Sequence, residues 1–303
     1  MLQPEKFEYA VPNLSYMCQD FKEKVFKKIT ASSTSLFLRG RDTINVTPSV
    51  TGRHEEDVEE VIAWAADAGQ DNFLIDIGAN VGLISCLCGS KFKQVFCYEP
   101  NPLAFKVLEV NTRIALTDAS RLHLFNCAIG DGNTELELII PKQNWGGAYI
   151  AQGNGYDQRT LLKKDGYTEF DADNYLKEIV TVKKAEDALG SIFKKLSNAG
   201  QNQGVIKIDA EGYEPTILKA LARILPDSFK VVLIFENHLS QSSSTVLDLF
   251  KSRCRIFEIK SKKVRGATIV RLIKSLFGAK RRVMLEDPQG TMRKGNYALF
   301  VGV

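Results

Sequence analysis

Phe73-Leu-Ile-Asp-Ile-Gly-Ala-Asn-Val-Gly82 is the stretch that decides the fold. Residues 72–77 predict a buried strand, and the glycines that follow predict a tight turn into a helix. Gln94–Tyr98 predicts a second strand, directly before Glu99, and residues 205–210 predict a third strand with an acidic end. These strands predict an open α/β sheet, and ligands bind at the carboxyl edge of such a sheet.

Apolar periodicity predicts further elements on both sides of this centre. The expected helices are 16–29, 55–68, 82–90, 102–111, 185–196, 215–224 and 245–251, and the expected additional strands are 35–39, 122–129, 135–140, 179–183, 231–236, 255–259 and 297–301. Gly130-Asp-Gly-Asn133 predicts a hairpin between two of the strands. Residues 141–178 are polar and glycine-rich, which is typical of a functional lid, and Trp145-Gly-Gly-Ala148 would stack on a ligand there or plug the loop.

The composition is that of an ordinary globular protein, with 303 residues, 44% hydrophobic and 25% charged. No apolar run approaches the ~20 residues that span a bilayer, and no secretory signal is visible at the N-terminus. The cysteine pattern predicts free thiols in a reducing compartment rather than a zinc site. We expect a single cytoplasmic domain, with a core of 52–259 and 296–303, an N-terminal elaboration of 1–50 and a basic insertion of 260–295.

The basic insertion carries most of the positive charge. Residues 260–294 have a net charge of +9, so the remainder of a chain of net charge +4 carries −5. Apolar residues within it share one helical face between basic clusters, a pattern typical of a helix attracted to anionic lipid. We therefore expect peripheral contact of 262–282 with the inner face of the membrane. A solvated insertion, or a helix packed on the core, is the alternative, and nucleic-acid binding is disfavoured because no nucleic-acid motif occurs.

The glycine turn excludes two common nucleotide sites. Its spacing, Gly78-x-Asn80-x-Gly82, is not the G-x-G-x-x-G of NAD-binding oxidoreductases, and no GxxxxGK[ST] of a P-loop occurs. Glu99 follows the second strand roughly 20 residues after the turn, where a carboxylate is well placed to accept from a ribose diol. Separately, the glycines could only shape a turn and Glu99 could only begin a helix. Together they predict an adenosine-bearing ligand.

These residues resemble the FkbM-type methyltransferase family, within the class I S-adenosylmethionine-dependent fold. The resemblance covers residues 52–237, and it rests on five motifs. They are Asp76-Ile-Gly-Ala-Asn-Val-Gly82, Tyr98-Glu-Pro-Asn-Pro102, Asn111, Cys127-Ala-Ile-Gly-Asp131 and Ile206-Lys-Ile-Asp-Ala-Glu-Gly-Tyr-Glu214. It implies a Rossmann-like α/β fold, with a mostly parallel sheet, helices on both faces and an antiparallel C-terminal strand.

The resemblance also implies S-adenosylmethionine as cofactor and O-methylation of a sugar, a glycan or a natural product. The glycine turn would hold the methionine part, Glu99 the ribose, and the residues around Cys127 the adenine. The expected cofactor-binding residues are Asp76, Gly78, Ala79, Asn80, Gly82, Glu99, Asn101, Cys127, Ala128 and Asp131.

Lys207, Asp209 and Glu211 project to the same side of an extended strand, so we expect them at the catalytic edge. A lysine in so apolar a strand is costly unless it is paired, so Lys207 should bond Asp209 or another carboxylate of the pocket. A purely structural ion pair is the alternative. The acceptor would be a small molecule or a glycan, and a lipid-linked one would suit the basic segment. An RNA or amine acceptor, or a non-catalytic interaction module, stays open.

Residues at the end of the strand expected at 231–236 could activate an acceptor hydroxyl in two ways. His238 is a candidate general base because imidazole titrates near neutrality. Alternatively, Asp209, Glu236 or Asn237 could hold a divalent cation that acidifies a bound hydroxyl. A capping role for Asn237 or His238 is equally open. The catalytic candidates are therefore Lys207, Asp209, Glu211 and His238.

Overall fold

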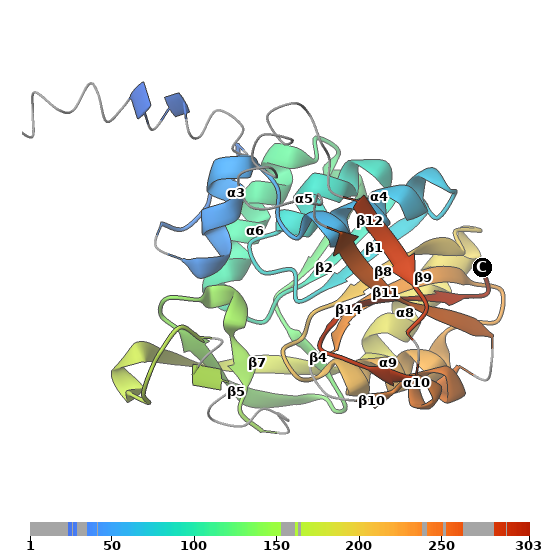
Figure 1. Cartoon of the computed structure of the whole chain (residues 1–303). Coiled ribbons are helices and arrows are strands. Elements are labelled where there is room, and N and C mark those ends of the chain that lie inside the picture. Colours follow the sequence, from blue (N-terminus) through green and yellow to red (C-terminus); the bar gives the residue numbers. More distant parts are fainter. Residues whose placement is uncertain are drawn as a thin grey trace, which may run out of the picture.

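The computed structural model describes residues 24–25, 27–28, 35–40, 42–152, 161–162, 165–237, 241–250, 253–262, 282–288 and 290–303. A central eight-stranded sheet organises them (Figure 1). Its strands, in spatial order, are β3 (Leu122–Phe125), β2 (Gln94–Tyr98), β1 (Phe73–Ile77), β8 (Gln203–Ile208), β9 (Lys230–Asn237), β14 (Gly295–Val301), β11 (Cys254–Lys262) and β12 (Arg282–Glu286).

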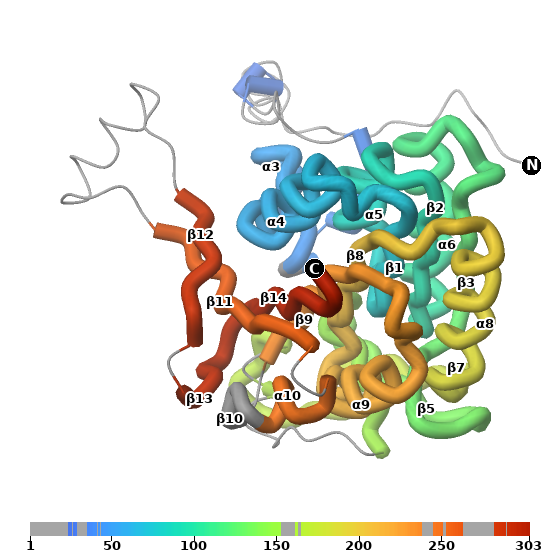
Figure 2. The backbone as a smooth tube through the Cα atoms, turned by 90° about the vertical axis from the view of Figure 1, so that its right-hand side faces the viewer, coloured from blue at the N-terminus to red at the C-terminus, as the bar shows by residue number. Residues whose placement is uncertain are grey.

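The first five strands of this order run parallel, and β14, β11 and β12 are each antiparallel to their neighbours. The predicted mostly parallel sheet with an antiparallel C-terminal strand is therefore confirmed. Figure 2 shows the β11–β12 hairpin at one end of the sheet, far from β3. The parallel register sets Asp76 of β1 beside both Cys97 and Lys207. A carboxylate and a lysine thus come together near the carboxyl edge of the sheet.

Helices cover both faces of the sheet (Figure 1) and pack their apolar residues against it. One layer contains α4 (Glu56–Asp67), α5 (Leu83–Cys88) and α6 (Pro102–Ala115), and the other contains α8 (Ala185–Asn198) and α9 (Glu214–Ile224). In α4 the buried stripe includes Val58, Ile62 and Ala65. The shorter helices are α3 (Val46–Thr51) and α10 (Ser243–Leu249). Within the described residues we find no helix whose length and hydrophobicity would let it cross a bilayer.

A second, four-stranded sheet lies beside the carboxyl edge of the first. It contains, in spatial order, β4 (Ala128–Gly130), β7 (Tyr175–Lys184), β5 (Thr134–Pro141) and β6 (Tyr149–Ile150). The expected continuous strand 122–129 is therefore wrong, because it divides between the two sheets. The hairpin expected at 130–133 is also wrong, because β7 lies between β4 and β5 and pairs with both.

The strand expected at 35–39 is not formed. The backbone N–H and C=O of Phe37 instead bond the side-chain amide of Asn111, at 2.7 and 3.0 Å, so they are not available to a neighbouring strand. The helix expected at 16–29 lies largely outside the described residues. Of the basic insertion expected at 260–295, residues 263–281 lie outside them, whereas 260–262 belong to β11 and 282–286 form β12. Minor elements complete the fold: the paired strands β10 (Gln241–Ser242) and β13 (Thr291–Met292), and short 3-10 turns at Thr43–Asn45, Gly89–Lys91, Ala119–Arg121, Trp145–Gly147 and Ala172–Asn174.

Candidate active site

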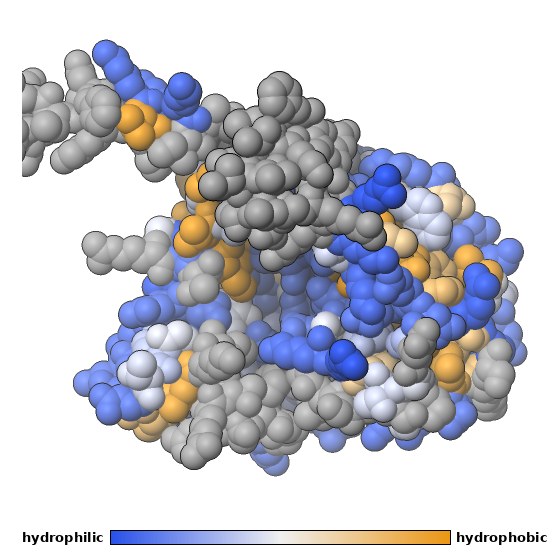
Figure 3. Space-filling view, in the orientation of Figure 1, coloured by the Kyte–Doolittle hydropathy of each residue, from blue (hydrophilic) through white to orange (hydrophobic). Residues whose placement is uncertain are grey.

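A pocket of about 850 Å³, open in part to solvent, lies at the carboxyl ends of β1, β2 and β8. Its floor is the turn after β1, and its opposite wall comes from the second sheet and from Ile44 and Trp145. In Figure 3 the surface is recessed between the α3 side of the molecule and the second sheet.

The turn after β1 brings backbone very close to the end of β8. Gly78 has φ of 81°, and a Cβ placed on it would lie 1.8 Å from the carbonyl oxygen of Asp209. Only glycine fits there. Gly82 (φ 87°) begins α5, and a Cβ on it would meet Leu108 at 2.7 Å. The predicted turn thus positions the floor of the pocket, although Gly82 itself does not line it.

Glu99 is held in a fixed orientation at the end of β2. It is 6% exposed, and its two carboxylate oxygens each accept one backbone N–H, from Asn80 and from Asn101, at 2.7 Å. Burial raises the pKa of Glu99 to about 7 against the lowering by these two hydrogen bonds, and Asp76 adds to the rise. Each oxygen keeps a second lone pair, so the group can still accept from a vicinal diol.

Asp76 carries an acceptor that the protein does not satisfy. It is 1% exposed, Oδ2 accepts from Ser85 at 2.6 Å, and Oδ1 has no hydrogen-bond partner among the described residues. The side-chain oxygen of Asn80 is buried without a partner in the same way. Buried acceptors are nearly always satisfied, so two of them at one pocket indicate a ligand with donor groups.

An apolar slot lies on the β2 side of the pocket. Cys127, Ala128 and Ile129 line it from the start of the second sheet, and Tyr98 joins them from β2. These apolar residues line the pocket together with Glu99, so they suit a heteroaromatic base. Asp131 does not line the pocket, and lies instead in a separate surface hollow with Lys184 and Arg223. Asn101 is fully buried and caps α6, with Oδ1 accepting from Leu103 N at 3.1 Å.

The Lys207–Asp209 pair forms as predicted, with Nζ and Oδ2 3.0 Å apart. Burial alone would lower the pKa of Lys207, but Asp209, Asp76 and Glu55 outweigh it and raise the pKa above the usual value. Glu214 at the start of α9 accepts from the backbone N–H of Ala210 and Gly212 at 2.9 and 3.0 Å. Glu214 thus fixes the turn that carries Glu211.

The remaining predicted catalytic and metal-binding residues do not come together at one point. Glu211 lines the pocket in a left-handed conformation, with φ of 44°. Glu236 lies in an adjoining hollow, and Asn237 donates to the carbonyl of Arg293 at 3.1 Å. His238 lies outside the described residues. No group of three or more His, Cys, Asp or Glu that could hold a metal occurs in the described part of the chain, so the cation site at Asp209, Glu236 and Asn237 finds no support.

The pocket also contains residues that the motifs did not indicate. His54 and Ile44 line it from the segment before α4, and Glu55 faces the adjoining hollow. The only sequence signal is a His-Glu pair at the start of an acidic helix, which a surface helix would show equally. Trp145 lines the pocket as the loop motif suggested. Its backbone N–H donates to Asp42 at 3.1 Å, and the Arg39 guanidinium lies 4.3 Å from its ring.

Comparison with known proteins gives the family. Residues 76–257 match the Methyltransferase FkbM domain, which is more than half of the chain, so the protein belongs to the FkbM methyltransferase family. Methyltransferase 1 of Beauveria bassiana is 23% identical over 156 residues, covering 50% of this chain and 59% of that protein. Methyltransferase sdnD of Sordaria araneosa is 26% identical over 164 residues, covering 52% and 62%. The chain thus spans less than two thirds of either relative.

Two further similarities concern a short segment of the chain and a solved structure. The hexuronic acid methyltransferase AglP of Haloferax volcanii is 38% identical over 60 residues, which are 20% of this chain and 24% of that protein. Among solved structures, a methyltransferase FkbM from Methylobacillus flagellatus aligns with a TM-score of 0.36 and 13% identity, over 93% of this chain and 60% of that one.

Proposed function

We propose that this protein is an S-adenosylmethionine-dependent methyltransferase that methylates a hydroxyl of a sugar, a glycan or a natural product. The observation that carries the proposal is the Glu99 carboxylate, oriented by two backbone N–H groups and still able to accept from a diol inside an 850 Å³ pocket. Family membership supports the reaction class.

The residues of the pocket fit the parts of this cofactor. Glu99 would accept from the ribose hydroxyls, and the apolar slot beside it would take the adenine. The unsatisfied oxygens of Asp76 and Asn80 would accept from the ammonium of the methionine part. The cofactor supplies a methyl group already activated as a sulfonium, so the protein has mainly to align the acceptor and exclude water.

The other residues at the carboxyl edge of the sheet support a hydroxyl as the methyl acceptor. A sugar hydroxyl is weakly acidic and needs a base, and Asp209 and Glu211 bring carboxylates to the pocket on the far side of β1 from Glu99. The similarity to a hexuronic acid methyltransferase favours a sugar as acceptor, although it covers only 20% of this chain.

The test is titration calorimetry with S-adenosylhomocysteine on the wild type, Glu99→Ala and Asp131→Asn. Asp131 is the matched control because it is an acid outside the pocket. We expect micromolar affinity, weakened at least tenfold by Glu99→Ala and unchanged by Asp131→Asn. Absence of binding to a folded wild type would reject the proposal. Methyl transfer to soluble uronic acids, followed by mass spectrometry, then tests the acceptor class.

The membrane contact expected for 262–282 is a separate proposal. At the base of this segment Lys260 and Lys262 already form ion pairs with Glu286, at 3.1 and 2.6 Å, so these two lysines attract lipid less than their charge suggests. Co-sedimentation with anionic vesicles, with and without the segment, tests the contact. Equal binding of both proteins would reject it.

A further inference from the structure

The segment before α4 presents a histidine that no part of the cofactor site uses. His54 lines the pocket, and its side chain is 20% exposed. Among the described residues neither ring nitrogen has a hydrogen-bond partner. The carboxylate of Glu55 lies beside it, with Oε2 3.9 Å from Nε2. A largely buried imidazole that faces a pocket without a partner is available to a ligand.

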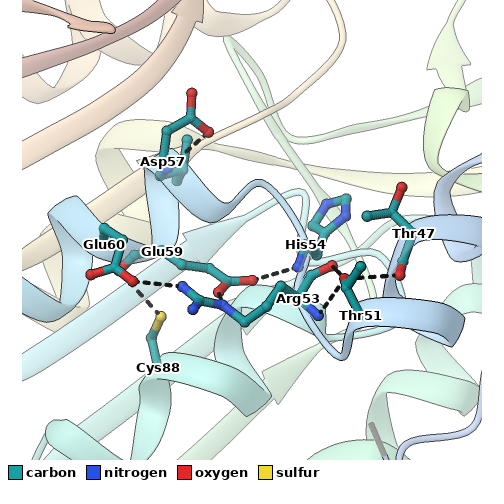
Figure 4. A network of polar contacts seen from close by, with 9 residues as sticks. Thr47, Thr51, Arg53, His54, Asp57, Glu59, Glu60 and Cys88 are labelled. Carbon is teal, nitrogen blue, oxygen red and sulfur yellow. Dashed lines mark hydrogen bonds and ion pairs between the residues drawn. The ribbon is translucent and has the colours of Figure 1, made fainter. Parts of the chain in front are cut away.

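The backbone around His54 is fixed by a polar network (Figure 4). The N–H of His54 donates to buried Glu59 at 2.6 Å, and the Arg53 guanidinium bonds both Glu59 and Glu60. Thr51 accepts from the N–H of Arg53 at 3.2 Å. In Figure 4 the imidazole points away from this network. The network therefore holds the main chain and leaves the ring free to act.

The conformation of Glu55 is strained, as is common at functional sites. Its φ is 46°, a left-handed conformation that is unfavourable for a residue with a Cβ. In the described part of the chain only Asn80 and Glu211 share this feature among non-glycine residues, and both line the pocket. The three strained positions thus surround one site.

His54 and Glu55 lie on the side of the pocket away from Glu99. The sheet order is β2, β1, β8, β9, so the ribose-binding end is at β2 and the opposite end is at β8 and β9. Glu55 lines a hollow of about 210 Å³ with Glu236 and Asn296, and this hollow shares Lys207 and Asp209 with the main pocket. An acceptor that enters beside β8 and β9 therefore meets this pair.

Burial and the neighbouring charges set the protonation states of the pair at pH 7. Burial lowers the pKa of His54 to about 4, with Lys207 adding to the shift and Asp209 opposing it, so the ring is neutral at pH 7. Burial raises the pKa of Glu55 to about 7. Lys207 opposes this rise, and the carboxylates of Asp209, Glu236 and Asp57 add to it. Asp209 is already engaged with Lys207, whereas the neutral ring of His54 can accept a proton.

We propose that His54 is the general base for the acceptor hydroxyl and that Glu55 stabilises the imidazolium. The inference rests on the proposed function. As the acceptor oxygen bonds to the methyl carbon, the carbon–sulfur bond breaks and its electron pair stays on sulfur. The hydroxyl proton passes to His54. One positive charge leaves sulfur as another forms on the ring, so the net charge of the pocket does not change.

The first test requires no acceptor. Sinefungin carries an amine where the sulfonium methyl would be, whereas S-adenosylhomocysteine carries nothing there. We expect His54→Leu to weaken sinefungin binding at least about tenfold and S-adenosylhomocysteine binding less than about twofold. His123→Leu is the matched control, because His123 lies on the edge strand β3, outside the pocket, and bonds Gln94 of β2. Nitrogen-15 spectra of the three histidines should show a shift of the His54 signal with sinefungin alone.

The outcomes separate the two proposals. If the wild type binds neither compound, the proposed function fails. If the wild type binds both and His54→Leu changes neither affinity nor signal, only the assignment of His54 fails. On a hydroxyl acceptor that the wild type methylates, His54→Leu should lower kcat at least about 100-fold with cofactor affinity retained. Glu55→Gln should lower kcat less and shift the acid limb of the pH profile, which a merely structural residue would not do.

Discussion

Affinity for the cofactor should depend on pH through Glu99. The carboxylate lies between two backbone N–H donors, and burial raises its pKa from 4.5 to about 7. Two hydroxyl donors of a ribose bind the ionised form better than the protonated form, because the ionised group only accepts. Binding should therefore strengthen as the pH rises through 7.

The magnitude follows from the fraction of Glu99 that is ionised. With a pKa of about 7, roughly one tenth is ionised at pH 6 and roughly nine tenths at pH 8. The apparent dissociation constant varies inversely with this fraction, so it should be about tenfold lower at pH 8. Because the folded pKa is the higher one, the same group lowers the free energy of unfolding of the unliganded protein by about 3 kcal/mol as the pH rises from 4.5 to 7.

The assay is calorimetric titration of S-adenosylhomocysteine at pH 6, 7 and 8. Glu99→Gln should bind weakly at every pH, because the amide does not titrate and turns a donor toward a backbone N–H. Glu55→Gln is the matched control, since Glu55 also titrates near pH 7 but lies at the opposite end of the pocket. An affinity that is equal at pH 6 and 8, or a tenfold change that persists in Glu99→Gln, would refute the reasoning.

Three further predictions concern single substitutions. Gly78→Ala should destabilise the protein by at least about 3 kcal/mol in urea unfolding, because its Cβ would overlap the carbonyl oxygen at the end of β8, whereas Gly132→Ala, with open space, should not. Lys207→Met should cost about 3–5 kcal/mol at pH 7.5 and less at pH 5, where the carboxylates left behind take up protons. Trp145→Phe should abolish the change in tryptophan fluorescence on ligand binding, and Trp64→Phe, altering a residue outside the pocket, should preserve it.

The meeting of the motif residues at one pocket was predictable because these residues lie at strand ends. Each motif consists of an apolar strand followed at once by a glycine turn or an acid, and parallel strands bring their carboxyl ends to one edge. Gly78, Glu99 and Asp209 therefore meet although they are far apart in the chain. The buried pairing of Lys207 was predictable for the same reason, since its cost in an apolar strand requires a partner.

The second sheet was not predictable from local signals. The turn at 130–133 is typical of a hairpin, but β7, more than 40 residues later, takes the position between β4 and β5. Strand periodicity also runs through residues 126 and 127, where the chain leaves one sheet for the other. Neither the position of β7 nor the break between β3 and β4 can be predicted from a window of a few residues, because the tertiary arrangement determines which strands pair.

Lys207 connects the residues of the sequence motifs with His54 and Glu55, which no sequence motif indicated. Its ammonium is bonded to Asp209, and it interacts with Asp76 at the proposed cofactor end and with Glu55 at the proposed acceptor end. The motif residues owe their place to the strands. His54 and Glu55 reach the same lysine only because α4 packs on the sheet with its first turn beside β8. A base supplied in this way can differ between relatives that share every cofactor motif, so acceptor choice should vary with the segment before α4.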